Sequence, residues 1–241
     1  MSRAPRPLIL VSNDDGVLAP GLVALRAELV RVGETAILAP EHNWSAAGHT
    51  KTLHKPLRVS EVTLADGLPA LAASGSPSDC VALALLGVLD RRPDVVVSGI
   101  NLGANVGNDL TYSGTVAAAM EAVIWGVTAI AVSLDALQPE DLGVAARFAA
   151  RLAQRVLEDT PPYPLLLNVN VPAVPEPQLR GVRITRLGQR IYRDALVKRL
   201  DPRGRPYYWI GGEPPSGRPE PGTDIGALAE GYISVTPVRL D

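Results

Sequence analysis

Short apolar runs alternate with amphipathic segments over the first two-thirds of the chain, and this alternation restricts the fold more than any other feature. The first run, residues 8–11 (LILV), contains no polar residue. A strand that is apolar on both sides fits a parallel sheet covered by helices on both faces. The next segment, residues 20–32, has leucines at near-helical spacing and is followed by Gly33, which favours a helix that ends at a glycine.

The same alternation continues to about residue 160. The expected strands cover residues 8–11, 36–39, 95–97, 129–134, 165–171, 182–187 and 232–238, the expected helices cover 20–32, 116–125 and 139–157, and a β-ribbon over 53–72 and a loop over 98–112 lie between them. A further helix opens at Ser76, which can cap it, with Pro77 at the first helical position and Asp79 beside the cap.

Strands that alternate with helices predict an α/β fold, Rossmann-like, with a doubly wound and mostly parallel sheet. We expect one domain over residues 1–241, with an α/β core over 1–160 and a β-rich C-terminal extension over 161–241. Within the extension, residues 189–221 mix charged, aromatic, glycine and proline residues around a turn candidate at 201–204, which predicts a protruding hairpin arm. The arm has aromatic side chains that suit an interface between copies of the chain or, alternatively, a cover for the domain's own core: Tyr192, Tyr207, Tyr208 and Trp209.

The composition excludes several classes of protein. Hydrophobic residues make up 46% of the 241 residues and charged residues 20%, which excludes a disordered chain. The net charge of −2 supplies no basic field for a nucleic-acid polymer, and no apolar run reaches the ~20 residues of a membrane span. Cys80 is the only cysteine, so no internal disulfide can form, and its apolar neighbours favour a place in the core. We expect a soluble, cytoplasmic protein.

Three polar loops follow apolar runs and carry the unusual chemistry of the chain. They contain residues 13–16 (NDDG), 43–45 (NWS) and 99–115. Ligands of an open parallel sheet bind beyond the carboxyl ends of its strands, so we expect the three loops to meet at one edge.

Asp14 and Asp15 come directly after the first strand, where Gly16 allows the chain to turn. Two carboxylates held close together repel each other, and a divalent cation relieves that repulsion. Ser45 and Asn101 are further oxygen donors, so the set predicts a hard cation such as Mg²⁺, Mn²⁺ or Ca²⁺. Alternatively, an aspartate at such a turn caps the next helix or forms an Asx-turn.

Ser113, Gly114 and Thr115 precede an alanine-rich helix and favour an anion site. The backbone N–H groups at a helix N-terminus point at a ligand, the helix dipole favours negative charge, and the two hydroxyls add donors. The alternative is an ordinary serine or threonine N-cap, which does not account for the Gly/Asn-rich loop before it.

Several familiar motifs are missing from the sequence. It has no G-x-x-x-x-G-K-[ST] motif of P-loop NTPases, no dinucleotide-binding G-x-G-x-x-G and no G-x-S-x-G of serine hydrolases. A zinc site stays an alternative, although the spacing of the three histidines fits no standard motif: His42, His49 and His54.

Signatures in order along the chain resemble those of the SurE family, the stationary-phase survival proteins. The first covers residues 10–16 and 19–21, and the third covers 112–121. The second covers residues 98–101 with Gly103, Asn105 and Gly107. The similarity continues through residues 168–172, 201–204 and 222–224, and so extends over nearly the whole chain.

The resemblance implies a metal-dependent phosphatase that hydrolyses nucleoside 5′-monophosphates, and some members also act on 3′-nucleotides or short polyphosphate. It implies one divalent ion, Mg²⁺ or Mn²⁺, held in each subunit by Asp14, Asp15, Ser45 and Asn101. It assigns the phosphate to Asn105, Ser113, Gly114 and Thr115. Asp14 and Asp15 are the expected catalytic residues, with either as base or nucleophile. The resemblance also implies dimers or tetramers formed through the arm.

Two positions depart from the family. Ala46 follows Ser45 where many members have glycine, and the chain stops at Asp241 where members continue into a C-terminal helix, so swapping of C-terminal segments stays open. A nonenzymatic nucleotide sensor that uses the same loops is the main rival function. A metal-dependent transferase would need an acceptor site, of which the sequence has no sign.

Overall fold

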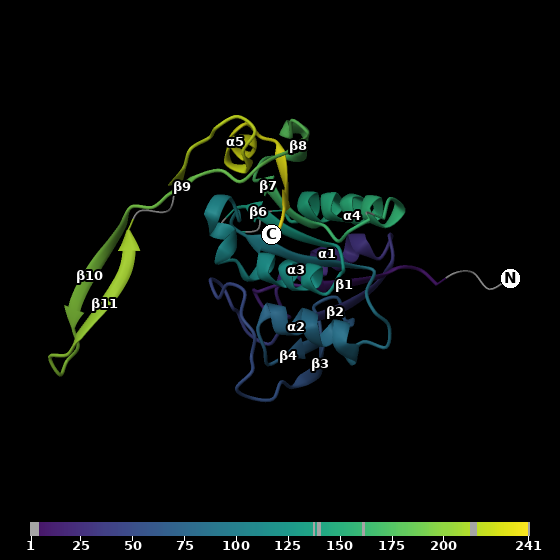
Figure 1. Ribbon diagram of the computed structural model, residues 1–241, viewed down its shortest axis with the longest axis horizontal. Helices are drawn as coiled ribbons and strands as arrows, with labels where there is room; N and C mark the ends of the chain where they lie inside the picture. The colour runs from purple at the N-terminus through teal and green to yellow at the C-terminus, as the bar shows by residue number, and fades with distance from the viewer. Residues whose placement is uncertain (1–4, 137, 139–140, 161, 213–215, 241) are drawn as a thin grey trace.

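A nine-stranded sheet with helices on both faces forms the centre of the part of the chain that the computed structural model describes, residues 5–136, 138, 141–160, 162–212 and 216–240 (Figure 1). The strands lie in the order β3-β4-β2-β1-β5-β6-β7-β13-β8. Their bounds are β1 Leu8–Ser12, β2 Glu34–Pro40, β3 Val59–Thr63, β4 Pro69–Ala73, β5 Val95–Leu102, β6 Ala129–Asp135, β7 Leu166–Pro172, β8 Val182–Ile184 and β13 Ile233–Val238.

Six neighbouring strands, from β4 to β7, run parallel to one another. Numbered along the chain among themselves, they have the order 3-2-1-4-5-6, which is the order of a doubly wound Rossmann sheet. The order reverses between β1 and β5, and such a reversal leaves a crevice beyond the carboxyl ends of the two strands. The predicted Rossmann-like α/β fold is therefore confirmed.

The helices form one layer on each face of the sheet. Helices α1 (Pro20–Leu29) and α4 (Gly143–Glu158) pack together on one face, and α2 (Pro77–Leu83) and α3 (Gly114–Ile124) pack together on the other. Alternate strand residues enter the two cores: Ile9 lies beneath α1 and α4, and Leu10 beneath α2 and α3. Ser76 caps α2 in a capping box with Asp79, and Cys80 is buried, both as predicted. No helix among the described residues combines the length and apolar character that a bilayer span needs.

Several predicted boundaries are wrong. Strand β8 ends at Ile184 and not at residue 187, and helix α3 begins at Gly114 and not at residue 116. Strand β5 does not end at residue 97 but continues to Leu102, because its pairing with β6 resumes at Asn101 after an irregularity. Helix α1 ends at Leu29, earlier than predicted, because its last residues close in a turn. Helix α4 begins at Gly143, and its predicted start at Pro139 lies outside the described residues.

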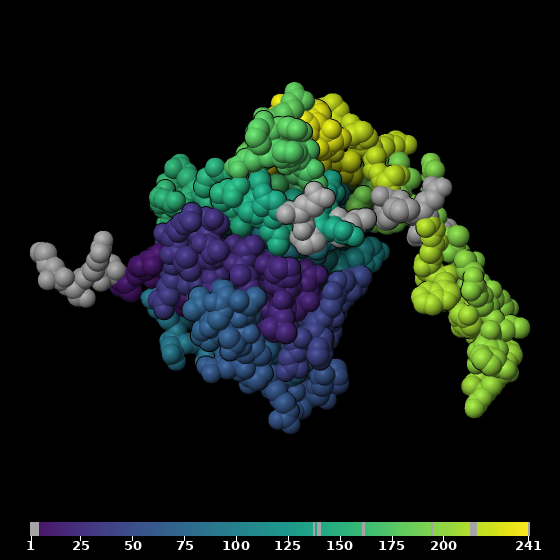
Figure 2. Space-filling view, turned by 180° about the vertical axis from the view of Figure 1, so that it is seen from behind, coloured from purple at the N-terminus to yellow at the C-terminus, as the bar shows by residue number. Residues whose placement is uncertain are grey.

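The arm was predicted over residues 189–221, and its described residues, 189–212 and 216–221, project from the body of the molecule (Figures 1 and 2). Strands β10 (Asp194–Leu200) and β11 (Pro206–Gly212) pair antiparallel in its hairpin, and β9 (Arg190–Ile191) pairs with β12 (Ser216–Gly217) at its base. The side chains of Trp209 and Ile210 are 65% and 80% exposed. They do not cover the domain's own core, which was the alternative. A short helix, α5 (Asp224–Ala229), connects the arm to β13.

Candidate functional site

The three polar loops meet at the carboxyl edge of the sheet, close to the strand reversal between β1 and β5. The Trp44 N–H donates to the Asp14 carbonyl at 2.7 Å, and the Gly48 N–H donates to the Tyr112 carbonyl at 3.0 Å. The first bond joins the loop after β1 to the loop after β2, and the second joins that loop to the segment before α3. The prediction that these loops converge is confirmed.

Asn13, rather than an aspartate, closes the turn after β1. Its Oδ1 accepts from the Gly16 N–H at 3.2 Å, and its Nδ2 donates to the Gly16 carbonyl at 3.0 Å. The Asx-turn that was the alternative role for Asp14 and Asp15 therefore belongs to Asn13. Both carboxylates are left for other contacts.

The Asp14 carboxylate lies at the N-terminus of α3. Thr115 Oγ1 donates to Asp14 Oδ1, and a Cβ on Gly114 would lie 2.5 Å from Asp14 Cβ, so only glycine fits there. Burial raises the pKa of Asp14, although the Thr115 hydroxyl and the backbone N–H groups of Gly114 and Thr115 oppose the rise. The negative group that the α3 N-terminus faces in this structure is thus Asp14 itself.

Asp15 is half-buried and shares the site with Asp14. Burial, together with the negative charge of Asp14, raises the pKa of Asp15 to about 6. Within the described part of the chain, no lysine, arginine or histidine is among the groups that shift the pKa of Asp14 or Asp15. Two like charges in a partly dehydrated site therefore lack a positive partner, which is the arrangement that a bound cation stabilises.

Asn101 and Ser45 lie at the same edge of the sheet as the aspartates. Asn101 is near the end of β5, and its Nδ2 donates to the Gly103 carbonyl at 2.8 Å, so its Oδ1 is the atom left for a cation. Ser45 is exposed in the loop that Trp44 ties to Asp14. The structure brings all four residues to one edge; within the described chain, neither Asn101 nor Ser45 hydrogen-bonds to an aspartate.

Ser113 combines the two roles that the sequence left open. Its Oγ accepts from the Val116 N–H at 3.2 Å, which is an ordinary N-cap of α3. A hydroxyl that accepts in this way still has its hydrogen to donate. The N-cap therefore does not exclude an anion at the same helix end.

Asn105 is held from several sides. Its N–H donates to Asn170 Oδ1 at 2.8 Å, and its carbonyl accepts from Asn168 Nδ2 at 2.8 Å and from Asn170 Nδ2 at 3.0 Å. Asn105 Nδ2 also donates to Ser133 Oγ at 2.8 Å. This support was not predicted. Its signal in the sequence is a pair of asparagines, two residues apart, on one side of the apolar strand β7.

The histidines considered for zinc do not form a metal site. His49 Nε2 pairs with Glu121 Oε2 at 2.9 Å, and Lys51 Nζ pairs with Glu121 Oε1 at 2.7 Å. Over the described residues, no group of three His, Cys, Asp or Glu side chains is placed to hold a metal ion. The donor set at the carboxyl edge is instead two carboxylates, one amide and one hydroxyl, which suits a hard cation.

Comparisons with known proteins agree with the signatures in the sequence. The family model described as survival protein SurE matches residues 9–194. Two relatives named 5′-nucleotidase SurE, from Herpetosiphon aurantiacus and Chloroflexus aggregans, are 59% and 57% identical, covering 97% of this chain and 92% and 93% of their own lengths. The crystal structure of the SurE protein from Aquifex aeolicus matches with a TM-score of 0.82 and 37% identity, covering 98% of this chain and 94% of that one. This chain therefore belongs to the SurE family.

Proposed function

We propose that this protein is a divalent-metal-dependent phosphatase that releases phosphate from nucleoside 5′-monophosphates. The relatives reported above are named 5′-nucleotidases, and they resemble nearly the whole chain. One observation carries the proposal: two aspartates share a site beside a helix N-terminus, at the strand reversal of the sheet. Among the described residues, no basic side chain is one of the groups that shift their pKa values.

The proposed ion is one Mg²⁺ or Mn²⁺ in each subunit, with Asp14, Asp15, Ser45 and Asn101 as ligands. All four residues offer oxygen atoms, which these hard cations prefer. A cation beside the two carboxylates would lower both of their pKa values and remove their mutual repulsion. When bound, such an ion neutralises charge on the phosphoryl group and activates water.

The phosphate is proposed to lie between the loop before α3 and the first turn of α3. The Ser113 hydroxyl and the Asn105 amide each keep a hydrogen that can be donated to a phosphate oxygen. The N–H groups of Gly114 and Thr115 face Asp14 in this structure. With Asp14 bound to the proposed cation, they and the helix dipole would stabilise charge that develops on the phosphoryl group. Asp14, locked by Thr115, and the more exposed Asp15 are the residues that can orient the attacking water.

Phosphate release from 5′-AMP tests this proposal. With Mn²⁺ or Mg²⁺ present we expect release, loss of release after a chelator is added, and recovery when the ion is restored. Parallel assays with 3′-AMP and tripolyphosphate show whether the activity extends to those substrates. No release with any divalent ion, although the nucleotide binds, would favour the rival role as a nucleotide sensor.

The proposal also includes self-association and a cytoplasmic location. Seven apolar or aromatic residues of the hairpin are exposed: Leu196, Val197, Leu200, Tyr207, Tyr208, Trp209 and Ile210. An exposed apolar group of this kind, on an arm that projects from the body, supports an interface that joins copies of the chain into dimers or tetramers. The single cysteine, which excludes a disulfide within the chain, supports the proposed location.

A further inference from the structure

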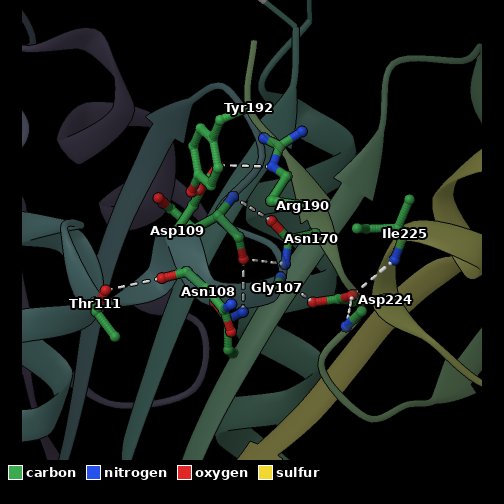
Figure 3. Close-up of polar contacts among 12 residues, drawn as sticks. Gly107, Asn108, Asp109, Thr111, Asn170, Arg190, Tyr192, Asp224 and Ile225 are labelled. Carbon is green, nitrogen blue, oxygen red and sulfur yellow. Dashed lines mark hydrogen bonds and ion pairs between the residues drawn. The ribbon is translucent and has the colours of Figure 1, made fainter. Parts of the chain in front are cut away.

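Asp224 is a fully buried aspartate that the proposed reaction does not use. It lies at the start of α5, and its carboxylate accepts hydrogen bonds from three backbone N–H groups (Figure 3). Asp224 Oδ2 accepts from Gly107 at 2.8 Å, and Oδ1 accepts from Gly188 at 2.7 Å and from Ile225 at 2.8 Å. One side chain therefore joins the loop before α3 to the segment that leads into the arm.

The two joined segments approach each other closely. Gly107 has a φ of +56°, and a Cβ at this position would lie 2.7 Å from the Gly188 carbonyl oxygen. A side chain at position 107 would push the segments apart. The contact brings both N–H groups within reach of a single carboxylate, which satisfies them away from water.

The Gly107 contact lies two residues from Asn105, the residue proposed to bind phosphate. On one side of this stretch, Asn168 and Asn170 of β7 hold the Asn105 backbone. On the other side, Asp224 holds the Gly107 N–H. The position of the Asn105 amide therefore depends on β7 and on α5 together.

We propose that Asp224 is a positioning residue that sets the Asn105 amide for phosphate binding by fixing the Gly107 N–H. This inference rests on the proposed function, because it takes Asn105 as a phosphate ligand. Asp224 is fully buried, and both of its oxygens are bound to backbone N–H groups, so it acts through Gly107 and not on the substrate.

Asp224→Asn tests the inference because it keeps the shape of the side chain and removes one acceptor. The asparagine oxygen can keep the bonds with Gly188 and Ile225, which turns its NH₂ group toward the Gly107 N–H. We expect the Kd of inorganic phosphate and the KM for 5′-AMP to rise about tenfold. The Kd of Mn²⁺, measured by isothermal titration calorimetry, should stay within about twofold of the wild-type value, because the proposed metal ligands are untouched.

Asp66→Asn is the matched control, because Asp66 also binds a buried group, the Arg26 guanidinium, at the other end of the strand order. It should lower Tm without changing the Kd of phosphate. Gly188→Ala serves if Asp224→Asn does not fold. Its Cβ would lie 2.9 Å from Asp224 Oδ1, so it should displace the carboxylate and weaken phosphate binding in the same direction.

Three results overturn the inference. In the first, a folded Asp224→Asn variant binds phosphate as tightly as the wild type; in the second, its phosphate and Mn²⁺ affinities fall together; in the third, Asp66→Asn loses phosphate affinity to the same extent. If the wild type hydrolyses 5′-AMP and Asp224→Asn keeps its KM, only this inference fails. If the wild type releases no phosphate from any 5′-nucleotide, the proposed function fails and the inference fails with it.

Discussion

Asp14 and Asp15 are neighbours in the sequence but lie in different surroundings. Asp14 is buried and accepts a hydrogen bond from Thr115, whereas Asp15 is half-buried with a pKa raised to about 6 by burial and by the charge of Asp14. Both residue types, and the serine-glycine-threonine segment, could be identified from the sequence. The contact between Asp14 and Thr115 could not, because it joins residues 101 positions apart and depends on how α3 packs against β5, the strand next to β1.

Asp14→Asn should abolish turnover and leave the fold intact. Asparagine keeps the shape of the side chain and an oxygen for Thr115, but it removes the charge on which the proposed cation depends. We expect phosphate release from 5′-AMP to fall by at least about 100-fold at saturating Mn²⁺. A variant with a native circular dichroism spectrum and wild-type turnover would contradict this role.

Ala46→Gly should stabilise the protein. Ala46 has a φ of +59°, a left-handed conformation that costs a residue with a side chain about 1–2 kcal/mol. Glycine removes that cost, but its greater freedom in the unfolded chain lowers stability by about 0.4–1 kcal/mol. The expected net gain in the free energy of unfolding is therefore about 0.5–1 kcal/mol. Urea unfolding measures the difference, and a clear loss of stability would contradict the assigned backbone strain.

At the scale of elements, local signals predicted β1, the capped start of α2, the N-cap of α3 and the hairpin of the arm. The course of β5 through residues 98–102 was not predicted, because its glycine and polar residues resemble a loop and only pairing with β6 makes them a strand. The support that Asn168 and Asn170 give to Asn105 was also missed, since it requires that β7 and the loop before α3 be neighbours in space.

The loop that carries Ser45 is fastened to α3 by Glu121. This carboxylate is 1% exposed and contacts His49, Lys51 and Trp125. Burial alone would raise the pKa of Glu121, but the hydrogen bonds from these three side chains lower it to about 2. Since the folded pKa lies below the ordinary value of 4.5, the carboxylate contributes stability that is complete above about pH 5 and is lost as the pH falls toward 2.

Glu121→Gln should therefore destabilise the protein at neutral pH and have much less effect in acid. The expected difference in free energy of unfolding is on the order of 3 kcal/mol near pH 7, and it should shrink as the pH falls below about 5. Urea unfolding of wild type and variant at several pH values provides the comparison. A difference that does not change with pH would show that the charge of Glu121 is not what holds the loop.

At the scale of the whole molecule, the base of the arm lies against the loop before α3. Arg190 Nε pairs with Asp109 Oδ2 at 2.6 Å, and Tyr192 donates to the same carboxylate (Figure 3). This hydrogen bond, with burial, raises the pKa of Tyr192 to about 12. The hairpin beyond this base exposes its aromatic residues.

Removal of the hairpin, with a short Gly-Ser turn in place of residues 194–212, should convert the proposed oligomer into a monomer. The exposed aromatic and aliphatic side chains of β10 and β11 supply the apolar surface that an interface buries. Trp209→Ser should weaken association in the same direction with less disturbance. Analytical ultracentrifugation measures both, and a folded variant without the hairpin that keeps the wild-type sedimentation coefficient would exclude the arm as the interface.

We propose that the two aspartates after β1 and the oxygen donors of the neighbouring loops hold a hard cation beside the phosphate at the α3 N-terminus. A crystal structure determined with Mn²⁺ and phosphate tests it most directly. We expect an anomalous manganese peak about 2.0–2.6 Å from oxygens of Asp14 and Asp15, with the phosphate next to Ser113. Carboxylates that face apart, with the manganese absent from this edge or bound elsewhere, would contradict it.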